Sequence, residues 1–164
     1  FGSVGLSAVH ASWQYMMIAN DGIAIPVHIF KNTVSPDLSK DGIKAIEKET
    51  AMQLRSIMES TVLAGTASNA YKRGRLKLLR TVVGGKTGTL TGSNPQGLTT
   101  WFAGMYPIEN PEISIAAVVL LENLWKFKAS NLAAEGFMAY YDYKLQTSSA
   151  LNTARKNGSR ITTH

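Results

Sequence analysis

Residues 82–89 have the sequence VVGGKTGT, and residues 100–105 follow with TWFAGM. Because a strand turns successive side chains to opposite faces, Thr87 and Thr89 point to the same side, about 7 Å apart along the strand. Two hydroxyl groups at that spacing can bind one carboxylate. Gly88 between them removes a side chain where another backbone or a ligand must come close. The stretch therefore predicts an edge strand along which an extended ligand lies.

Lys86 adds a fixed positive charge to the same strand. Such a charge attracts a carboxylate and can hold a neighbouring hydroxyl ready to give up its proton. Strict alternation places Lys86 on the face opposite to Thr87 and Thr89. We therefore expect either that the strand twists strongly here or that Lys86 acts from the face opposite to the two threonines.

Helical periodicity is present in two parts of the first half of the chain. Ser7 is a good N-cap for a helix over about residues 8–20. Thr50 and Gln53 form a capping box for a second helix, which should end before Gly65. Three connecting segments are expected around these helices: an extended segment at 23–30, a loop at 31–48 and a short helical turn near 66–72.

Three strands are predicted at about residues 82–91, 99–107 and 113–121. The connection between the second and third, residues 108–112, is too short for a parallel crossover, so these two strands must form an antiparallel hairpin. Ser130 can cap a last helix, which should pack across the sheet. The fold class is therefore α+β: an antiparallel sheet, with three strands in this chain, packed by helices.

The composition is that of a folded domain of ordinary size, because 45% of the 164 residues are hydrophobic and 17% are charged. The longest purely apolar run, Ile115–Leu121, is far below the ~20 residues needed to cross a bilayer, so no membrane segment is expected here. The chain has no cysteine, which excludes disulfides and thiolate metal sites. The glutamates match no paired-acid or metal pattern, and we assign no metal and no cofactor. No triad spacing connects His10 to the other histidines, which favours a surface or core role for it.

Together these motifs resemble the penicillin-binding proteins and serine β-lactamases, whose third motif is K-T-G. Residues 5–22 are similar to the helix of that family that ends in an alanine-asparagine-glycine turn. Residues 50–67, which end in Gly-Thr-Ala, are similar to the next segment, and three strands follow in the family's order. The turn at Asn110 and Pro111 is most similar to the class B transpeptidases. The resemblance covers roughly residues 1–145 and is specific because several motifs occur in order.

The resemblance implies a two-step acyl transfer, in which a serine attacks the D-Ala-D-Ala carbonyl of a peptidoglycan stem peptide. Lys86 and Thr89 would be catalytic, with Lys86 as the electrostatic and proton-relay lysine. Thr87, Gly88 and Thr89 would bind the substrate or a β-lactam, and the two threonines would hold its terminal carboxylate. The Thr89 backbone N–H would form half of the oxyanion hole. Leu90 stands where a small residue is usual in the family, which narrows the expected cleft.

The family's S-x-x-K and S-x-N motifs are missing, because no serine has a lysine three residues on or an asparagine two residues on. We therefore expect residues 1–145 to be the C-terminal half of a transpeptidase domain, inactive alone, with the missing N-terminal half as its partner. Residues 146–164 should form a disordered tail. The resemblance implies the periplasmic or extracytoplasmic face of the bacterial cell membrane, with any anchor outside this fragment. Cell-wall synthesis proteins are further candidate partners.

A basic cluster precedes the K-T-G strand and consists of Lys72, Arg73, Arg75, Lys77 and Arg80. Such a cluster can attract nucleic acid or anionic lipid, but no aromatic platform or nucleic-acid motif accompanies it. A solvated loop is the simpler interpretation, and a surface that faces an anionic wall polymer is a third one. We expect no nucleic-acid partner.

Three classes of function stay open at this point. The first is the D,D-transpeptidase, and the second is a β-lactam sensor or catalytically inactive relative that keeps the cleft but signals or scaffolds. The third is an unrelated basic interaction module, which predicts no affinity for β-lactams. If half of a domain is absent, one face of the sheet should also expose an apolar patch.

Overall fold

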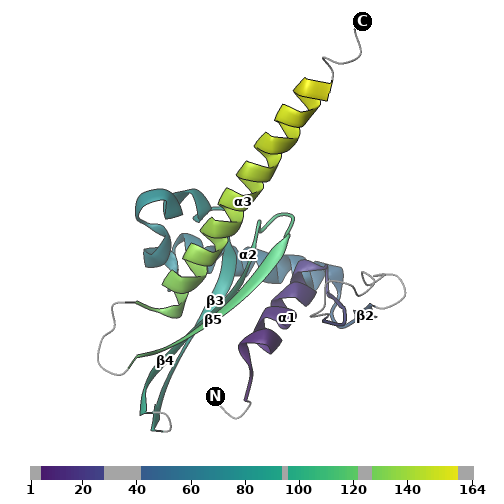
Figure 1. Cartoon of the computed structure of the whole chain (residues 1–164). Coiled ribbons are helices and arrows are strands. Elements are labelled where there is room, and N and C mark those ends of the chain that lie inside the picture. The colour runs from purple at the N-terminus through teal and green to yellow at the C-terminus, as the bar shows by residue number, and fades with distance from the viewer. Residues whose placement is uncertain (1–4, 28–41, 94–95, 122–126, 159–164) are drawn as a thin grey trace, which may run out of the picture.

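The computed structural model of the chain describes residues 5–27, 42–93, 96–121 and 127–158. Its centre is an antiparallel sheet of three strands in the order β3-β4-β5 (Figure 1). The strands are β3 (Gly84–Ser93), β4 (Gln96–Tyr106) and β5 (Ile113–Leu121). The predicted α+β class, the three strands and the hairpin between the second and third strands are confirmed.

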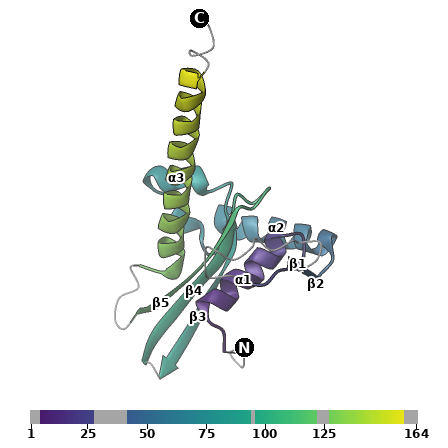
Figure 2. The same ribbon diagram turned by 45° about the vertical axis from the view of Figure 1, so that its right-hand side comes forward.

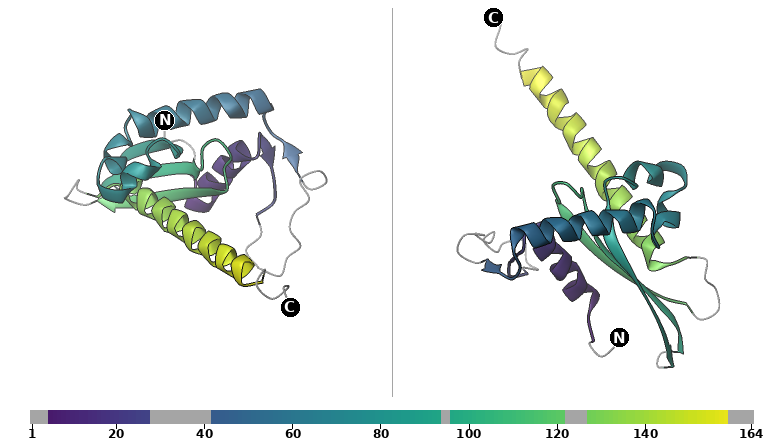
Figure 3. Two further views of the ribbon diagram at one scale, coloured as in Figure 1. Left: turned by 90° about the horizontal axis from the view of Figure 1, so that it is seen from above. Right: turned by 180° about the vertical axis from the view of Figure 1, so that it is seen from behind.

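Three helices surround this sheet: α1 (Ala8–Ala19), α2 (Lys48–Leu63) and α3 (Ala129–Gly158). Figure 3, seen from above, shows α2 and α3 on opposite sides of the sheet. α1 packs against β4 and β5. The Ser7 Oγ accepts a hydrogen bond from the His10 backbone N–H at 3.1 Å, which confirms Ser7 as the N-cap of α1.

α3 crosses one face of the sheet and then extends away from it (Figures 1 and 2). Its first turns bury Phe137 and Met138 in the same core as Phe102 of β4. This packing across the sheet is the arrangement predicted for the last helix. Residues 146–158 form the end of α3, which differs from the predicted disordered tail. Leucine, glutamine, alanine and lysine in this segment are good helix formers, so the helix continues past the sheet.

The start of α3 also differs from the prediction. The helix begins at Ala129, so Ser130 lies inside its first turn. The Asn131 Oδ1 atom accepts a hydrogen bond from the Lys128 backbone N–H at 3.0 Å. The side chain of Asn131 thus satisfies a backbone N–H at the start of the helix, and the Ser130 hydroxyl does not act as the cap.

α2 begins at Lys48, two residues before the predicted cap Thr50. Its N-cap is Glu47, which makes no side-chain cap hydrogen bond. The predicted capping box is therefore wrong, because Thr50 already lies in the first helical turn. The helix ends at Leu63, before Gly65, as predicted.

Two short strands, β1 (Ile23–Ala24) and β2 (Ile43–Lys44), form an antiparallel pair. β1 lies in the predicted extended segment 23–30, whose last three residues are outside the described ranges. β2 lies in a segment that the sequence predicts to be a loop, 31–48. A strand of two residues has too little alternation for its sequence to reveal it.

The basic cluster follows the 3-10 helix η1 (Ser68–Tyr71) and includes two residues of a second one, η2 (Gly74–Leu79). η1 matches the predicted helical turn, whereas η2 replaces the expected solvated loop. The two terminal nitrogens of the Arg75 guanidinium donate hydrogen bonds to the carboxylate of Asp142 on α3, and this ion pair holds the pKa of Asp142 below its usual range. Arg80 donates to the Leu63 carbonyl oxygen at 2.8 Å. These two cations anchor the segment to its neighbours.

The cross-strand register divides the sheet into two faces. The α3 face, which is the one covered by α3, includes the row Thr87, Phe102 and Ala117 and belongs to the larger apolar core. The opposite, α1 face includes Lys86 and ends in a patch of exposed apolar side chains. This patch comprises Leu90, Val118 and Leu120, which are 51%, 37% and 41% exposed.

Candidate active site on the edge of β3

The K-T-G residues lie at an edge of the sheet, because among the described residues β3 pairs with β4 alone. Thr87 and Thr89 share the α3 face, opposite Phe102 and Thr100 of β4. Thr87 is half-buried and Thr89 is exposed. The edge position and the two hydroxyls on one side of the strand therefore match the predicted geometry.

Thr66, in the turn after α2, contacts this row of threonines. Its Oγ1 lies 2.6 Å from the Oγ1 of Thr87, within hydrogen-bond distance. The contact fixes the Thr87 side chain on the α3 face and adds a hydroxyl to the site. Sequence analysis missed Thr66 as a site residue, although it belongs to the Gly-Thr-Ala element of residues 65–67. Only the fold brings together two residues that are 21 positions apart.

Lys86 lies on the α1 face, as strand alternation predicts. Its Nζ donates a hydrogen bond to the Thr87 carbonyl oxygen at 2.9 Å. The lysine thus reaches the backbone of the next residue from the opposite face, and no strong twist of the strand is required. Its side chain is exposed, so the charge is open to a ligand along the edge.

Glycine is required at Gly85 by the packing of the two strands. A Cβ atom at Gly85 would lie 2.4 Å from the Phe102 Cζ and 2.6 Å from the Ala103 carbonyl oxygen. At Gly88 an added Cβ would lie 3.3 Å from the Trp101 Cβ, which is a milder conflict. The glycine at position 85 therefore leaves room for the ring of Phe102. At this position it is the protein's own core, and not a ligand, that comes close to the strand.

Thr100 fixes the start of α3 beside this row. It is buried and lies directly opposite Thr89 on β4. Its Oγ1 accepts a hydrogen bond from the Ala129 N–H at 3.0 Å and donates one to the Val119 carbonyl oxygen at 3.2 Å. The first turn of α3 is thereby held on the same face as Thr87 and Thr89.

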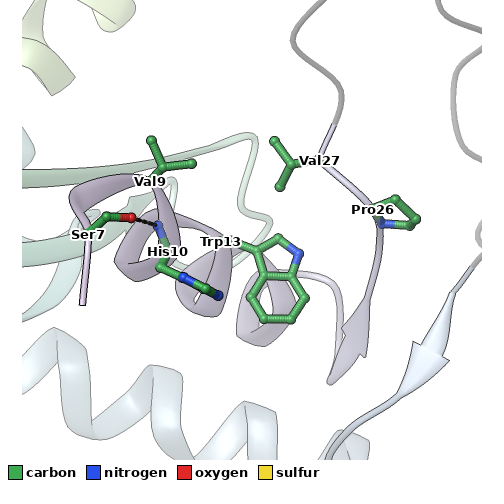
Figure 4. Close-up of a pocket in the computed structure, with 6 residues that line it drawn as sticks. All are labelled: Ser7, Val9, His10, Trp13, Pro26 and Val27. Carbon is green, nitrogen blue, oxygen red and sulfur yellow. Dashed lines mark hydrogen bonds between the residues drawn. The ribbon is translucent and has the colours of Figure 1, made fainter. Parts of the chain in front are cut away.

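A separate cavity lies beside α1 (Figure 4), and neither Thr87 nor Thr89 lines it. Its volume is about 300 Å³, and its lining residues are Ser7, Val9, His10, Trp13, Pro26 and Val27. Ser7 is occupied as the helix cap, and the Trp13 indole N–H donates to the Ile25 carbonyl oxygen at 2.6 Å. His10 packs edge-on against Trp13, with ring centroids 6.0 Å apart. The described lining residues include no nucleophile in contact with a base, and we do not place the site here.

Two further properties hold for the part of the chain that the structure describes. No group of three or more histidine, cysteine, aspartate and glutamate side chains is placed to hold a metal ion. None of the described helices combines the length and the apolar character needed to cross a membrane.

A family model for the penicillin-binding protein transpeptidase domain matches residues 1–141. The chain belongs to this family. Among solved structures, it is similar to the apo transpeptidase domain of penicillin-binding protein 3 from Burkholderia pseudomallei, with a TM-score of 0.64 and 29% identity. That match covers 87% of this chain and 42% of the other. The D,D-transpeptidase domain of a peptidoglycan glycosyltransferase from Eggerthella lenta gives a TM-score of 0.56 and 26% identity, over 83% of this chain and 32% of that one.

Curated relatives of this transpeptidase chain are also known. It is 29% identical over 136 residues to the penicillin-binding protein PbpB of Mycolicibacterium smegmatis, a match that covers 71% of this chain and 20% of the relative. PbpB of Mycobacterium tuberculosis is 28% identical over 141 residues, which cover 73% of this chain and 19% of the relative. The chain therefore spans about a fifth of the length of these relatives.

Proposed function

We propose that this chain supplies the K-T-G side of the active site of a peptidoglycan D,D-transpeptidase that works through an acyl-serine. The observation that carries the proposal is the edge of β3, where Thr87 and Thr89 present two hydroxyls and Lys86 reaches the same backbone. Membership of the transpeptidase family supports the reaction class. The nucleophilic serine would come from residues outside this sequence, in which no serine precedes a lysine by three positions.

The proposed roles follow from the positions of these groups. Thr87, held by Thr66, and Thr89 bind the terminal carboxylate of a D-Ala-D-Ala peptide or the carboxylate of a β-lactam. Lys86 stabilises that negative charge and relays a proton near the serine. The Thr89 backbone N–H forms half of the oxyanion hole. Loss of one such donor costs about 2.7–4 kcal/mol of transition-state stabilisation, so we expect no turnover from this chain alone.

The partner that completes the site is the remaining half of the same domain. The exposed patch of Leu90, Val118 and Leu120 on the α1 face offers an apolar surface against which it can pack. Lys86 lies on the same face as this patch, which would bring the lysine close to residues of the added half. We expect the whole protein to act outside the cytoplasmic membrane, on peptidoglycan stem peptides, alongside other cell-wall synthesis proteins.

Covalent labelling by a fluorescent penicillin tests this function in a longer form of the protein that extends upstream of Phe1. We expect labelling in the parent protein, and a loss of about 10²-fold or more in its rate for Lys86→Ala, which removes the proton relay. Lys77→Ala, which removes an exposed cation away from β3, is the matched control and should label at the parental rate.

The second candidate is a β-lactam sensor or catalytically inactive relative that retains this cleft. A sensor also labels with penicillin but does not transfer the acyl group to an amine, so turnover of a D-Ala-D-Ala peptide separates it from the enzyme. If the folded full-length protein is not labelled at all, we would conclude that it is a catalytically inactive relative.

A further inference from the structure

A second cavity, of about 590 Å³, opens beside the threonine row. It is bounded by the turn after α2, by η1 and by the first residues of α3. Among the described residues, its lining includes three cations, Lys72, Arg73 and Lys128, and no acidic side chain. A cavity with this lining has a positive potential and favours an anion.

The cavity is joined to the proposed substrate edge by Thr66. This residue lines the cavity and its hydroxyl also lies 2.6 Å from the hydroxyl of Thr87. On the other side, Ser130 and Asn131 line the cavity from the first turn of α3, which Thr100 holds on the α3 face. A ligand on the edge of β3 and a group in the cavity would therefore share one wall.

Ser130 adds a hydroxyl group to the wall of the cavity. The residue lines the cavity, yet it is only 7% exposed. Its hydroxyl makes no hydrogen bond to any other described residue. The Ser130 hydroxyl can therefore donate a hydrogen bond to a group that binds in the cavity. As a donor next to the start of a helix, it suits an oxyanion.

Two cations of the basic cluster, Lys72 and Arg73, line this cavity. Arg75 is paired with Asp142, and Arg80 with the Leu63 carbonyl oxygen. Lys72 donates to the Asn69 side-chain oxygen, which is itself part of the cavity wall. Arg73 has no hydrogen bond or ion pair within the described part of the chain. Glu135 and Asp142 line a neighbouring cavity with Arg73 and do not line this one.

We propose that this cavity is a second anionic subsite, which binds a carboxylate that a peptide substrate carries in addition to its terminal one. Arg73 and Lys72 supply the charge, while Ser130 and Thr66 supply hydroxyl donors. A compact anion fits better than an extended polyanion, because Arg75 and Arg80 are engaged and leave no continuous basic stripe. The peptide as the source of the carboxylate rests on the proposed function, whereas the anion site does not.

Amide chemical shifts of the ¹⁵N-labelled chain test the anion site, with glutarate as the probe and its neutral diamide, glutaramide, as the matched control. We expect glutarate to shift the amides of Thr66, Asn69 and Ser130, and glutaramide to leave them in place. Arg73→Gln should weaken glutarate binding about fivefold to tenfold. Ser130→Ala keeps the charge and should weaken it about threefold. Lys77→Gln, an exposed cation outside the cavity, should bind glutarate as the parent does.

Three results would overturn the subsite. Glutarate could leave the cavity amides unmoved, or Lys77→Gln could weaken binding as much as Arg73→Gln does, which would indicate only diffuse attraction. Inorganic phosphate could bind more tightly than glutarate at equal concentration, which would point to a phosphate-bearing polymer instead.

A pair of D-Ala-D-Ala peptides, one with a glutamate and the other with a glutamine at the same position, tests the peptide source. We expect the glutamate peptide to bind several-fold more tightly to the parent chain, and Arg73→Gln to bind both alike. Equal binding to the parent chain would overturn the peptide assignment. Penicillin labelling of the longer protein is independent of both results, so a failure of the proposed function is distinguishable from a failure of the subsite.

Discussion

The two faces of the sheet are held to their helices in different ways. On the α3 face, Phe102 and Phe137 are fully buried in the larger apolar core. On the α1 face the apolar core is smaller, and polar contacts connect the elements. Ser12 and Ser114 join α1 to β5 with Oγ atoms 2.9 Å apart, and Arg55 joins α2 to Asp21 at 2.8 Å. The difference indicates that elements of this chain cover the apolar core of the α3 face, whereas they cover the α1 face only in part.

This contrast has a consequence for the site. Thr87 and Thr89 belong to the α3 face, so their positions are set by contacts within this chain. Lys86 belongs to the partly covered face, where the proposed remaining half of the domain would pack. In the proposed site, the two threonines are thus positioned by contacts within this chain, whereas Lys86 would gain further contacts from the remaining half of the domain.

The largest effect is expected for Phe102→Ala on the α3 face. The substitution leaves a cavity in the larger core, next to Tyr71 and Phe137. We expect the free energy of unfolding, measured by urea denaturation, to fall by about 3–5 kcal/mol. A loss below about 1 kcal/mol would show that this face is not the stable half of the structure.

Gly85→Ala should have the next largest effect. Its Cβ atom would press on the ring of Phe102 and on the Ala103 carbonyl oxygen, so the strands must separate slightly. We expect a loss of about 1–3 kcal/mol by the same denaturation measurement. Gly88→Ala, where the conflict is milder, is the matched control and should lose less.

Asp21→Asn tests the polar connections of the α1 face. The side-chain hydrogen bonds of Lys48 and Arg55 lower the pKa of Asp21, so its contribution to stability is present above the unfolded pKa of about 3.9 and is lost as the pH falls through the lower folded value. Asparagine tolerates the positive φ of 55° at this position. We expect a lower urea midpoint for the variant at pH 7 and a smaller difference as the pH falls below the unfolded pKa. A difference that stays equal below the unfolded pKa would contradict the ion-pair account.

Leu120→Ser should have the smallest effect on stability. Its side chain is 41% exposed on the α1 face, and the free energy of unfolding should change by no more than about 0.5 kcal/mol. The same substitution should reduce self-association in sedimentation experiments, because it interrupts the apolar patch. A loss of several kcal/mol would mean that this face is already covered within the chain.

The sequence predicted the parts of the fold that have strong periodicity or clear stops. The strand that carries Lys86, the hairpin before Ile113 and the helix capped by Ser7 are examples. It did not reveal β2 or η2, because two-residue strands and 3-10 helices leave little pattern. The sequence also predicted the N-cap of α2 at Thr50, because Thr50 and Gln53 have the spacing of a capping box. The helix begins two residues earlier, at Lys48.

For the site, the residues of β3 could be predicted because they are contiguous. Thr66 and Ser130 could not, since only the packing of α2 and α3 against the sheet brings them to the same side as Thr87. The basic cluster illustrates the same limit. Its sequence shows several equivalent cations, and only the structure separates Arg75, which pairs with Asp142, from Arg73, which has no partner among the described residues.

The central claim is that the threonine row of β3 binds a carboxylate during acyl transfer. The most direct test is the second-order rate constant for acylation by benzylpenicillin in the longer protein, measured for Thr89→Val and for Thr91→Val, the next residue on the same face. We predict a loss of at least about tenfold for Thr89→Val, since a hydrogen bond to a charged group is removed, and no change for Thr91→Val. Acylation of Thr89→Val at the parental rate, or an equal loss in both variants, would contradict the account.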